Sequence, residues 1–351
     1  MSRTLIIKTS SMGDVIHNLP IVADMRRARP GMAIDWVVEE AYADLVRLHP
    51  GVDRVIPIAL RRWRAEGFGK ATRAERTAFR EQLREQRYDL GLDTQGLIKS
   101  ALVARSARVT ADGIRAGFSF GLVREGMARL FYDRGYRVDK RLHAIERLRA
   151  LAAAAVGYAN DSLGPPQFGL RVPPQHFDWL AATGAASTYA VLLHATARAE
   201  KTWPLERWGV LVRALIDAGI VPVLLWGNAA EEATAQSLAH GPGSLNRLSA
   251  MSACVPPRMT LPEVAALLSG ASAVIGVDTG LTHLAAALDV PTVGIFGATP
   301  RWRYAPYWTP RAINLGNYGE LGIQPATTAV LDALVKLRVL PVPTMAGDAN
   351  G

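Results

Sequence analysis

The stretch that decides the fold reads LIIKTSSMGDVIHNLPIV and spans residues 5–22. A short apolar run at 5–7 is followed by a polar turn and then by a segment of helical period, which predicts a strand, a loop and a helix. The same order recurs along the chain, where short β-branched runs alternate with longer helical segments. This alternation is typical of βαβ units, so the sequence predicts an α/β fold with parallel sheets.

Two sets of elements are expected, separated by a proline-rich stretch at 164–174 that we interpret as a linker. Strands are predicted before it at 5–8, 34–38, 55–58 and 89–93, and helices at 73–86 and 143–156. Strands are predicted after it at 189–193, 221–226, 273–277 and 292–296, and helices at 205–218, 231–239, 261–268, 281–288 and 328–337.

We therefore predict two doubly wound, Rossmann-like domains, 1–165 and 173–325. A C-terminal helix within 326–340 is expected to pack back toward the first domain. Two such domains would face a central cleft, and ligands of open α/β sheets bind beyond the carboxyl ends of the strands.

Composition favours a globular enzyme: of 351 residues, 49% are hydrophobic and 20% are charged. No window holds the roughly 18 uninterrupted apolar residues of a membrane helix, and the N-terminus does not resemble a signal peptide. The single cysteine, Cys254, cannot form an internal disulfide, which fits a reducing compartment. The most economical interpretation of Cys254 is an incidental thiol.

The formal net charge of +9 indicates an anionic partner, such as nucleic acid, an acidic membrane or a phosphorylated substrate, although it also serves solubility. The basic residues gather in the first half. Arg61, Arg62 and Arg64 surround Trp63, and a looser run holds Arg124, Arg129, Arg134, Arg137, Lys140 and Arg141.

The loop after the first strand lacks the glycine fingerprint of dinucleotide-binding domains and also lacks a Walker A motif. It offers instead a polar turn that ends in Gly13 and Asp14. Asp14 is interpreted either as a helix cap or as a general base aimed into the cleft, where the helix N-terminus would keep it ionised.

Two further loops combine groups that suit a phosphorylated ligand. The loop at 194–204 holds Thr196 and Lys201 before a helix, and ammonium groups together with helix amides bind phosphate. The loop at 276–283 places Asp278, Thr279 and Gly280 at a strand end, with His283 one turn later. A solvated loop and a structural histidine are the alternatives for these two segments.

Glu231, at another strand end, suits ribose hydroxyls, or else is a favourable charge at a helix start. Motifs of metal sites and of serine hydrolases are missing from the sequence, so no protein-held metal or cofactor is expected.

These residues resemble the lipopolysaccharide heptosyltransferase I family of Gram-negative bacteria, which are GT-B glycosyltransferases of family 9. The resemblance rests on KTSSMGDVIHNLP, DWVVEEAYADL, VIPIALRRWR, DTQGLIKSALVAR, LHATARAEKTWP and VDTGLTHLAAALDVPT, which together extend over most of the chain. It implies inverting transfer of L-glycero-D-manno-heptose from ADP-heptose to the Kdo of Kdo2-lipid A. The enzyme would be monomeric, would bind no nucleic acid and would work at the cytoplasmic face of the inner membrane without inserting into it.

The resemblance also implies roles for individual residues. Asp14 would be the general base. The donor would contact Thr196, Lys201, Glu231, Met259, Asp278, Thr279, Gly280 and His283, and the acceptor would contact Ser10, Ser11, Gly13, Arg61, Arg62, Arg64 and Lys99. One departure is Ala197, where the family often has a second threonine, so a donor contact is in question there.

Three alternatives remain at this point. A heptosyltransferase II-like enzyme would require an acceptor that already carries a heptose. A sugar-nucleotide epimerase of similar fold would need no acceptor. A basic nucleic-acid-binding protein would show strongly salt-dependent DNA binding and would give Asp14 and Asp278 no role.

Overall fold

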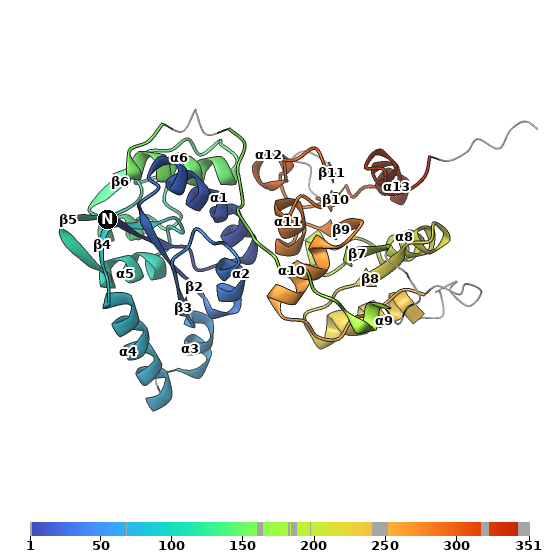
Figure 1. The fold of residues 1–351 in the computed structure, drawn as a ribbon, viewed down its shortest axis with the longest axis horizontal. Coiled ribbons are helices and arrows are strands. Elements are labelled where there is room, and N and C mark those ends of the chain that lie inside the picture. Colours follow the sequence, from blue (N-terminus) through green and yellow to red (C-terminus); the bar gives the residue numbers. More distant parts are fainter. Residues whose placement is uncertain are drawn as a thin grey trace, which may run out of the picture. The chain divides into compact units, whose positions relative to one another are not determined.

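The computed structural model describes residues 2–67, 69–159, 164–181, 183, 188–196, 198–240, 252–316 and 323–342. The chain forms two compact units, Met1–Val172 and Pro173–Gly351 (Figure 1). Each unit holds one sheet in which all strand pairs are parallel. The predicted fold class, two parallel-sheet α/β domains, is confirmed.

The first unit is built on a six-stranded sheet in the order β3-β2-β1-β4-β5-β6. Its elements are β1 (Arg3–Ile7), α1 (Met12–Ala28), β2 (Ala33–Glu39), η1 (Glu40–Tyr42), α2 (Ala43–Arg47), β3 (Arg54–Ile58), α3 (Leu60–Glu66), α4 (Lys70–Arg84), β4 (Arg87–Asp93), α5 (Ile98–Ser106), β5 (Arg108–Phe118), η2 (Gly126–Phe131), β6 (Arg134–Tyr136) and α6 (Ala144–Val156). The direction of winding reverses between β1 and β4, which are neighbours in the sheet. Such a reversal opens a crevice at the carboxyl ends of the two strands.

The second unit has a five-stranded sheet in the order β11-β10-β9-β7-β8, the other common doubly wound arrangement. Its elements are α7 (Asp178–Ala181), β7 (Tyr189–Leu193), η3 (Ala199–Lys201), α8 (Leu205–Asp217), β8 (Val221–Leu224), α9 (Ala229–His240), α10 (Leu261–Ser269), β9 (Ala273–Val277), α11 (Gly280–Ala287), β10 (Thr292–Ile295), α12 (Arg301–Tyr304), β11 (Ala312–Leu315) and α13 (Thr327–Lys336). Here the reversal lies between β7 and β9.

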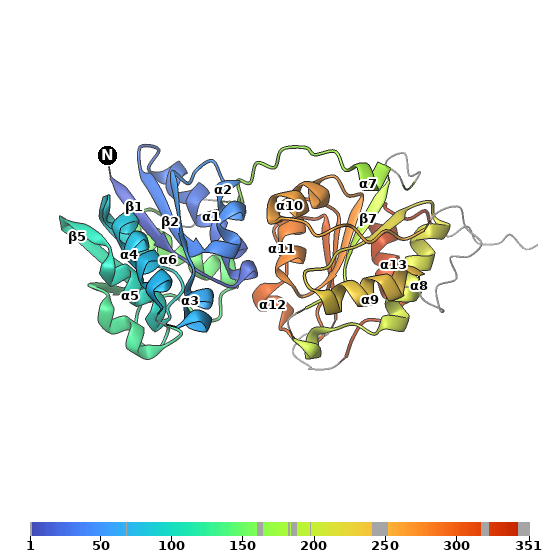
Figure 2. The same ribbon diagram turned by 90° about the horizontal axis from the view of Figure 1, so that it is seen from below.

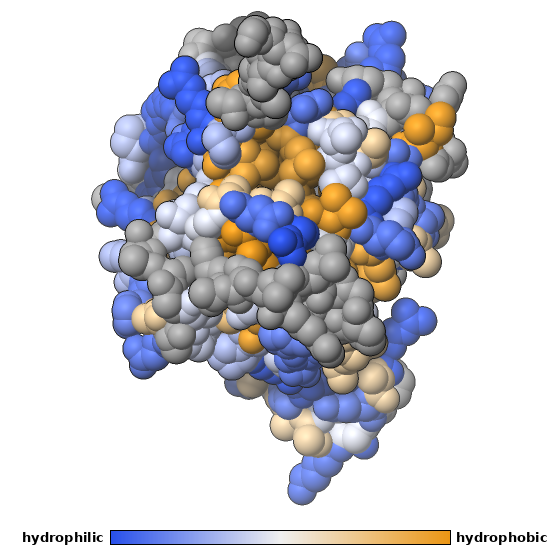
Figure 3. Space-filling view, turned by 90° about the vertical axis from the view of Figure 1, so that its right-hand side faces the viewer, coloured by the Kyte–Doolittle hydropathy of each residue, from blue (hydrophilic) through white to orange (hydrophobic). Residues whose placement is uncertain are grey.

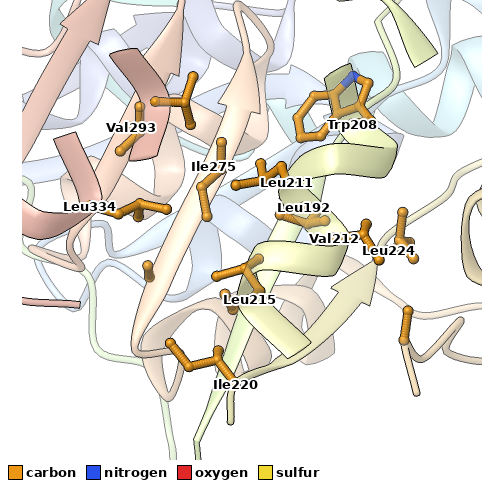
Figure 4. Close-up of a cluster of buried hydrophobic side chains, with 14 of the residues drawn as sticks. Leu192, Trp208, Leu211, Val212, Leu215, Ile220, Leu224, Ile275, Val293 and Leu334 are labelled. Atoms are coloured by element: carbon orange, nitrogen blue, oxygen red, sulfur yellow. The ribbon is translucent and has the colours of Figure 1, made fainter. Parts of the chain in front are cut away.

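The core of the second unit shows why its helices face the sheet as they do (Figure 4). Trp208, Leu211 and Leu215 recur at spacings of three and four along α8, so they form one apolar stripe and are fully buried. The stripe packs on Leu192 of β7 and Ile275 of β9 in a single buried cluster. Burial of this stripe fixes α8 on the sheet and thereby fixes the loop that precedes the helix.

The C-terminal helix α13 packs on the core of the second unit, and its expected packing toward the first domain stays a prediction. Its buried side chains, Val330, Ala333 and Leu334, belong to the core cluster of the second unit. The helix contacts α8, β10 and β11. Because these three residues make up the apolar face of α13, that face is already used within the second unit.

Three strands of the structure were not predicted from the sequence: β5, β6 and β11. In β5 only the last three residues, Ala116–Phe118, are buried, and every residue of the edge strand β11 is half-buried. Apolar runs in a sequence indicate strands that are covered on both faces, whereas β5 and β11 are only partly covered. The predicted central strands and the helices between them are present, with ends that differ from the predicted ones by at most three residues.

Figure 3 shows that hydrophilic residues border an apolar area on the face it draws. In the described part of the chain, no helix combines the length and the apolar character needed to cross a membrane.

Candidate active site

The loop after β1 carries Asp14 into the first turn of α1. Asp14 Oδ2 accepts hydrogen bonds from the backbone N–H of Ser11, at 3.1 Å, and from the Ser11 hydroxyl, at 3.0 Å. The other oxygen, Oδ1, lies 3.7 Å from Nζ of Lys8. The N-cap residue is Ser11, and Asp14 takes part in the cap as the third helical residue, whose Oδ2 accepts from Ser11.

The two charged groups of this pair differ in exposure. The side chain of Lys8 is 6% exposed, whereas that of Asp14 is 35% exposed. Burial lowers the pKa of Lys8, although the charges of Asp14 and Asp93 oppose the shift. Burial also disfavours the ionised form of Asp14, but the Lys8 charge and the Ser11 hydrogen bonds outweigh it and hold the pKa of Asp14 below its ordinary value. Asp14 is thus an ionised carboxylate that solvent reaches.

The loop after β4 supports this arrangement from the neighbouring strand. Lys8 Nζ donates to the carbonyl of Thr94 at 3.3 Å. Gln95 Oε1 accepts the backbone N–H groups of Thr9 at 3.1 Å and Ser10 at 3.2 Å. Lys8 and Gln95 were not among the predicted site residues. Two features of the sequence could have revealed them. Lys8 comes directly after a buried apolar run, and Gln95 lies in the polar turn DTQG after the adjacent strand.

The predicted acceptor residues between β1 and the first turn of α1 differ in their exposure to solvent. Ser10 is buried at 6% exposure, and its backbone is fixed by Gln95. Ser11 is exposed, and its hydroxyl is already bonded to Asp14. Gly13 is half-buried as the second residue of α1.

The three predicted acceptor arginines lie on the short helix α3 but are not equivalent. Arg62 is paired with three carboxylates: Glu40 at 3.0 Å, Glu66 at 3.4 Å and Glu75 at 2.9 Å. Arg61 stacks over the ring of Tyr42, with its guanidinium carbon 5.8 Å from the ring centroid, and remains exposed. Arg64 is exposed as well. The positive charge that α3 offers to an anion therefore comes from Arg61 and Arg64.

Lys99 lies in the first turn of α5 and is half-buried. Its charge and that of Arg61 act on Glu39, a buried carboxylate at the end of β2. Glu39 Oε1 accepts the backbone N–H of Arg61 at 2.9 Å. Burial nevertheless raises the pKa of Glu39 above its ordinary value. The contact ties the start of α3 to the end of β2.

The second unit brings three predicted donor residues together at its own strand reversal. Lys201 Nζ donates to Asp278 Oδ2 at 2.6 Å, and His283 Nε2 lies 3.1 Å from Asp278 Oδ1. Asp278 is 7% exposed and Lys201 is 20% exposed. Burial disfavours ionisation of Asp278, but the contacts with His283 and Lys201 outweigh it and hold the pKa of Asp278 well below its ordinary value.

The start of α11 adds a concentration of backbone N–H groups beside this cluster. Thr279 is the N-cap residue and Gly280 is the first residue of the helix. The Thr282 hydroxyl turns back to the carbonyl of Val277 at 2.7 Å. A Cβ on Gly276 would lie 2.3 Å from Thr282 Oγ1, so glycine is required for this close packing of strand and helix. Free amides at a helix start attract anions.

The remaining predicted donor residues surround the same sheet edge. Glu231 accepts the N–H of Gly227 at 2.8 Å and the side-chain amide of Asn228 at 2.8 Å, so it organises the start of α9. Thr196 and Met259 are half-buried, after β7 and directly before the N-cap of α10. Ala197 lies outside the described residues.

His194 is a buried residue at the start of the 194–204 loop and was not among the predicted site residues. Its Nε2 lies 3.2 Å from the carbonyl of Glu231, while Nδ1 has no partner among the described residues. Burial lowers the pKa of His194, which keeps the ring neutral. Among the described residues, no three His, Cys, Asp or Glu side chains are grouped so that they could hold a metal ion.

Known proteins share sequence and fold with this chain over most of its length. The model of glycosyltransferase family 9 (heptosyltransferase) matches residues 76–328. The chain belongs to glycosyltransferase family 9. Lipopolysaccharide heptosyltransferase 1 of Escherichia coli K12 is similar to this family 9 member over 298 residues at 45% identity, which covers 85% of this chain and 88% of that protein.

Two solved structures of a family 9 enzyme share the fold. E. coli heptosyltransferase WaaC with ADP superimposes with a TM-score of 0.82 at 39% identity and covers 95% of this chain and 99% of that one. WaaC with ADP-2-deoxy-2-fluoro heptose gives a TM-score of 0.79 with the same identity and coverage. The resemblance read from the sequence is confirmed at the level of family and fold.

Proposed function

We propose that this family 9 enzyme transfers L-glycero-D-manno-heptose from ADP-heptose to the Kdo of Kdo2-lipid A, with inversion at the anomeric carbon. The proposal is supported by 45% identity to a lipopolysaccharide heptosyltransferase 1 and by the fold shared with WaaC bound to an ADP-heptose analogue. The enzyme would act as a monomer at the cytoplasmic face of the inner membrane of a Gram-negative bacterium, without a resident metal.

The observation that carries the proposed chemistry is the state of Asp14. Its carboxylate is ionised and accessible to solvent, and both hydrogen bonds from Ser11 go to Oδ2. In the proposed reaction a Kdo hydroxyl attacks the heptose anomeric carbon as the bond to ADP breaks. Asp14 takes the hydroxyl proton, a step that contributes typically about 10²–10⁴-fold to the rate.

The second unit would hold the donor. Departure of ADP places negative charge on its diphosphate, which Lys201 and the N-terminal end of α11 would stabilise. Lys201 carries three N–H donors, so one can stay on Asp278 while the others reach phosphate oxygens. Glu231 and Met259 would contact ribose and adenine, and Thr196 and His283 would border the diphosphate and the sugar.

Incubation of the purified protein with ADP-heptose and Kdo2-lipid A, followed by mass spectrometry of the lipid, tests the function. We expect one added heptose and released ADP. Transfer only to an acceptor that already carries heptose would identify a heptosyltransferase II-like activity instead. Isomerised sugar nucleotide in the absence of acceptor would identify an epimerase.

A further inference from the structure

Five large hydrophobic side chains are exposed close together in the first unit, on α5, on η2 and on the turn before η2. They are Ile98, Leu102, Phe120, Met127 and Leu130, and between 37% and 63% of each is exposed. We call them the α5–η2 surface. Exposed apolar residues that are contiguous rather than scattered mark an interaction site.

The contacts between these elements make the five residues one surface. Helix α5 packs against η2. The N–H of Ile98 donates to Glu125 Oε2 at 2.7 Å, which joins the start of α5 to the residue before η2. The guanidinium of Arg129 lies 5.7 Å from the ring centroid of Phe120, which joins the turn to η2.

The periodicity of each element directs these side chains outward together. On α5, Ile98 and Leu102 are four residues apart and share a face, while Ala101 and Ala104 are buried beneath them. On η2, Met127 and Leu130 are three residues apart, which is one turn of a 3₁₀ helix, so they also share a face. Neither pair contributes to the buried cores of the unit.

Cationic side chains border the apolar residues. Arg105 extends the exposed face of α5 beyond Leu102, Arg124 precedes η2 and Arg134 follows it, and all three are exposed. Within the described residues, none of these three guanidinium groups has a carboxylate within 4.0 Å. From Gly96 to Leu142 the sequence holds ten Lys and Arg residues against four Asp and Glu residues. An apolar patch with an unbalanced basic rim is complementary to a bilayer that carries anionic headgroups.

The surface is also placed well for a substrate held in a bilayer. Gln95 accepts the backbone N–H of Ser10 at 3.2 Å, and the carbonyl of the next residue, Gly96, accepts the N–H of Glu125 at 2.9 Å. The segment that leads into η2 therefore lies beside the loop that carries the proposed general base. We propose that the α5–η2 surface docks the enzyme on an anionic lipid bilayer, with the five apolar side chains at the headgroup boundary and the arginines on lipid phosphates. This rests on the proposed membrane association and assigns it to specific residues.

Flotation with vesicles of phosphatidylcholine and phosphatidylglycerol in equal parts tests the proposal. The double variant Met127→Ser/Leu130→Ser should bind about tenfold more weakly than the wild type, because two apolar anchors are lost. Arg105→Gln/Arg134→Gln should also lose about tenfold, and added salt should weaken the binding of the wild type. Pure phosphatidylcholine vesicles should bind the wild type weakly.

Matched variants elsewhere control for general effects. Leu205→Ser/Val210→Ser removes from α8 two apolar side chains that are more than half exposed, and Arg73→Gln/Arg80→Gln removes two exposed arginines from α4. Both should bind vesicles as the wild type does. Equal binding by the Met127/Leu130 variant and the wild type would overturn the proposal. So would a change confined to self-association in sedimentation, since it would make the surface a contact between copies of the chain.

Activity separates this proposal from the proposed function. Heptose transfer to a water-soluble Kdo acceptor without acyl chains should be unchanged in the Met127→Ser/Leu130→Ser variant, whereas transfer to Kdo2-lipid A in vesicles should fall. Absence of transfer to either acceptor by the wild type would contradict the proposed function. Vesicle binding would still report on the surface.

Discussion

Each unit places a lysine beside a carboxylate at the point where the strand order of its sheet reverses. The more exposed member is the carboxylate in the first pair and the lysine in the second. In the first unit the lysine, Lys8, is buried and the carboxylate, Asp14, is the accessible partner. In the second unit the carboxylate, Asp278, is buried and the lysine, Lys201, is the more accessible partner. In the first pair the buried lysine helps to hold the pKa of Asp14 below its ordinary value. In both pairs the more accessible member is the one offered to a ligand. The first pair therefore suits proton removal, and the second suits an anion.

The distances sharpen the contrast. Lys201 and Asp278 are in direct contact at 2.6 Å, and His283 holds the other carboxylate oxygen. Lys8 and Asp14 are separated by 3.7 Å, and Lys8 is shared with the carbonyl of Thr94. The looser pair leaves Asp14 Oδ1 able to accept a proton from a substrate.

The largest expected effect comes from removing the accessible carboxylate. Asp14→Ala should lower kcat by about 10²–10⁴-fold, because the proton acceptor is lost. The affinity for ADP, measured by calorimetry, should stay nearly the same, since the donor residues lie in the other unit. Asp14→Asn keeps the bond from Ser11 and separates loss of the base from loss of the helix cap. Turnover within a few-fold of the wild type in both variants would refute the base assignment.

Removal of the accessible lysine should act on binding instead. Lys201→Met should weaken ADP binding by about 10- to 100-fold, the range of a lost charge-assisted hydrogen bond. Calorimetry measures it, with Lys140→Met as a control that removes an exposed lysine from the first unit. An unchanged dissociation constant for ADP would show that Lys201 does not hold the diphosphate.

The buried lysine offers a test in pH. Lys8→Met removes the cation that holds the pKa of Asp14 below its ordinary value. The pKa of Asp14 should rise, so the acidic limb of the kcat/KM profile should move to higher pH, with kcat reduced by about tenfold. A profile with an unmoved acidic limb would mean that Lys8 does not set the charge state of the base.

The smallest effects on kinetics are expected from substitutions on α3, where ion pairing decides which arginine can contact the acceptor. Arg62→Gln should change the KM for the acceptor by less than about twofold, because this guanidinium is already engaged by Glu40, Glu66 and Glu75 and exposed pairs contribute little. Arg61→Gln and Arg64→Gln should each raise that KM several-fold. Equal effects of all three substitutions in steady-state kinetics would contradict this ranking.

Much of the fold could be predicted from local pattern. The apolar runs of β7 and β9 are covered on both faces of a parallel sheet, so nearly every residue in them is apolar and the strand can be recognised in the sequence. The half-exposed strands β5 and β11 carry no such signal, and the apolar face of α13 did not reveal which unit would bury it.

For the candidate site, too, local sequence pattern predicted one part and not the other. By itself the sequence determined which polar loops follow the buried strands, because strand and helix periods place those loops at the carboxyl edge of each sheet. Only the tertiary structure decided that Lys8 is buried against Asp14, that Arg62 is already paired and that Lys201 is bonded to Asp278, 77 positions away. The physical reason is that ionisation and exposure depend on groups that the fold brings together, and no local pattern encodes those distances.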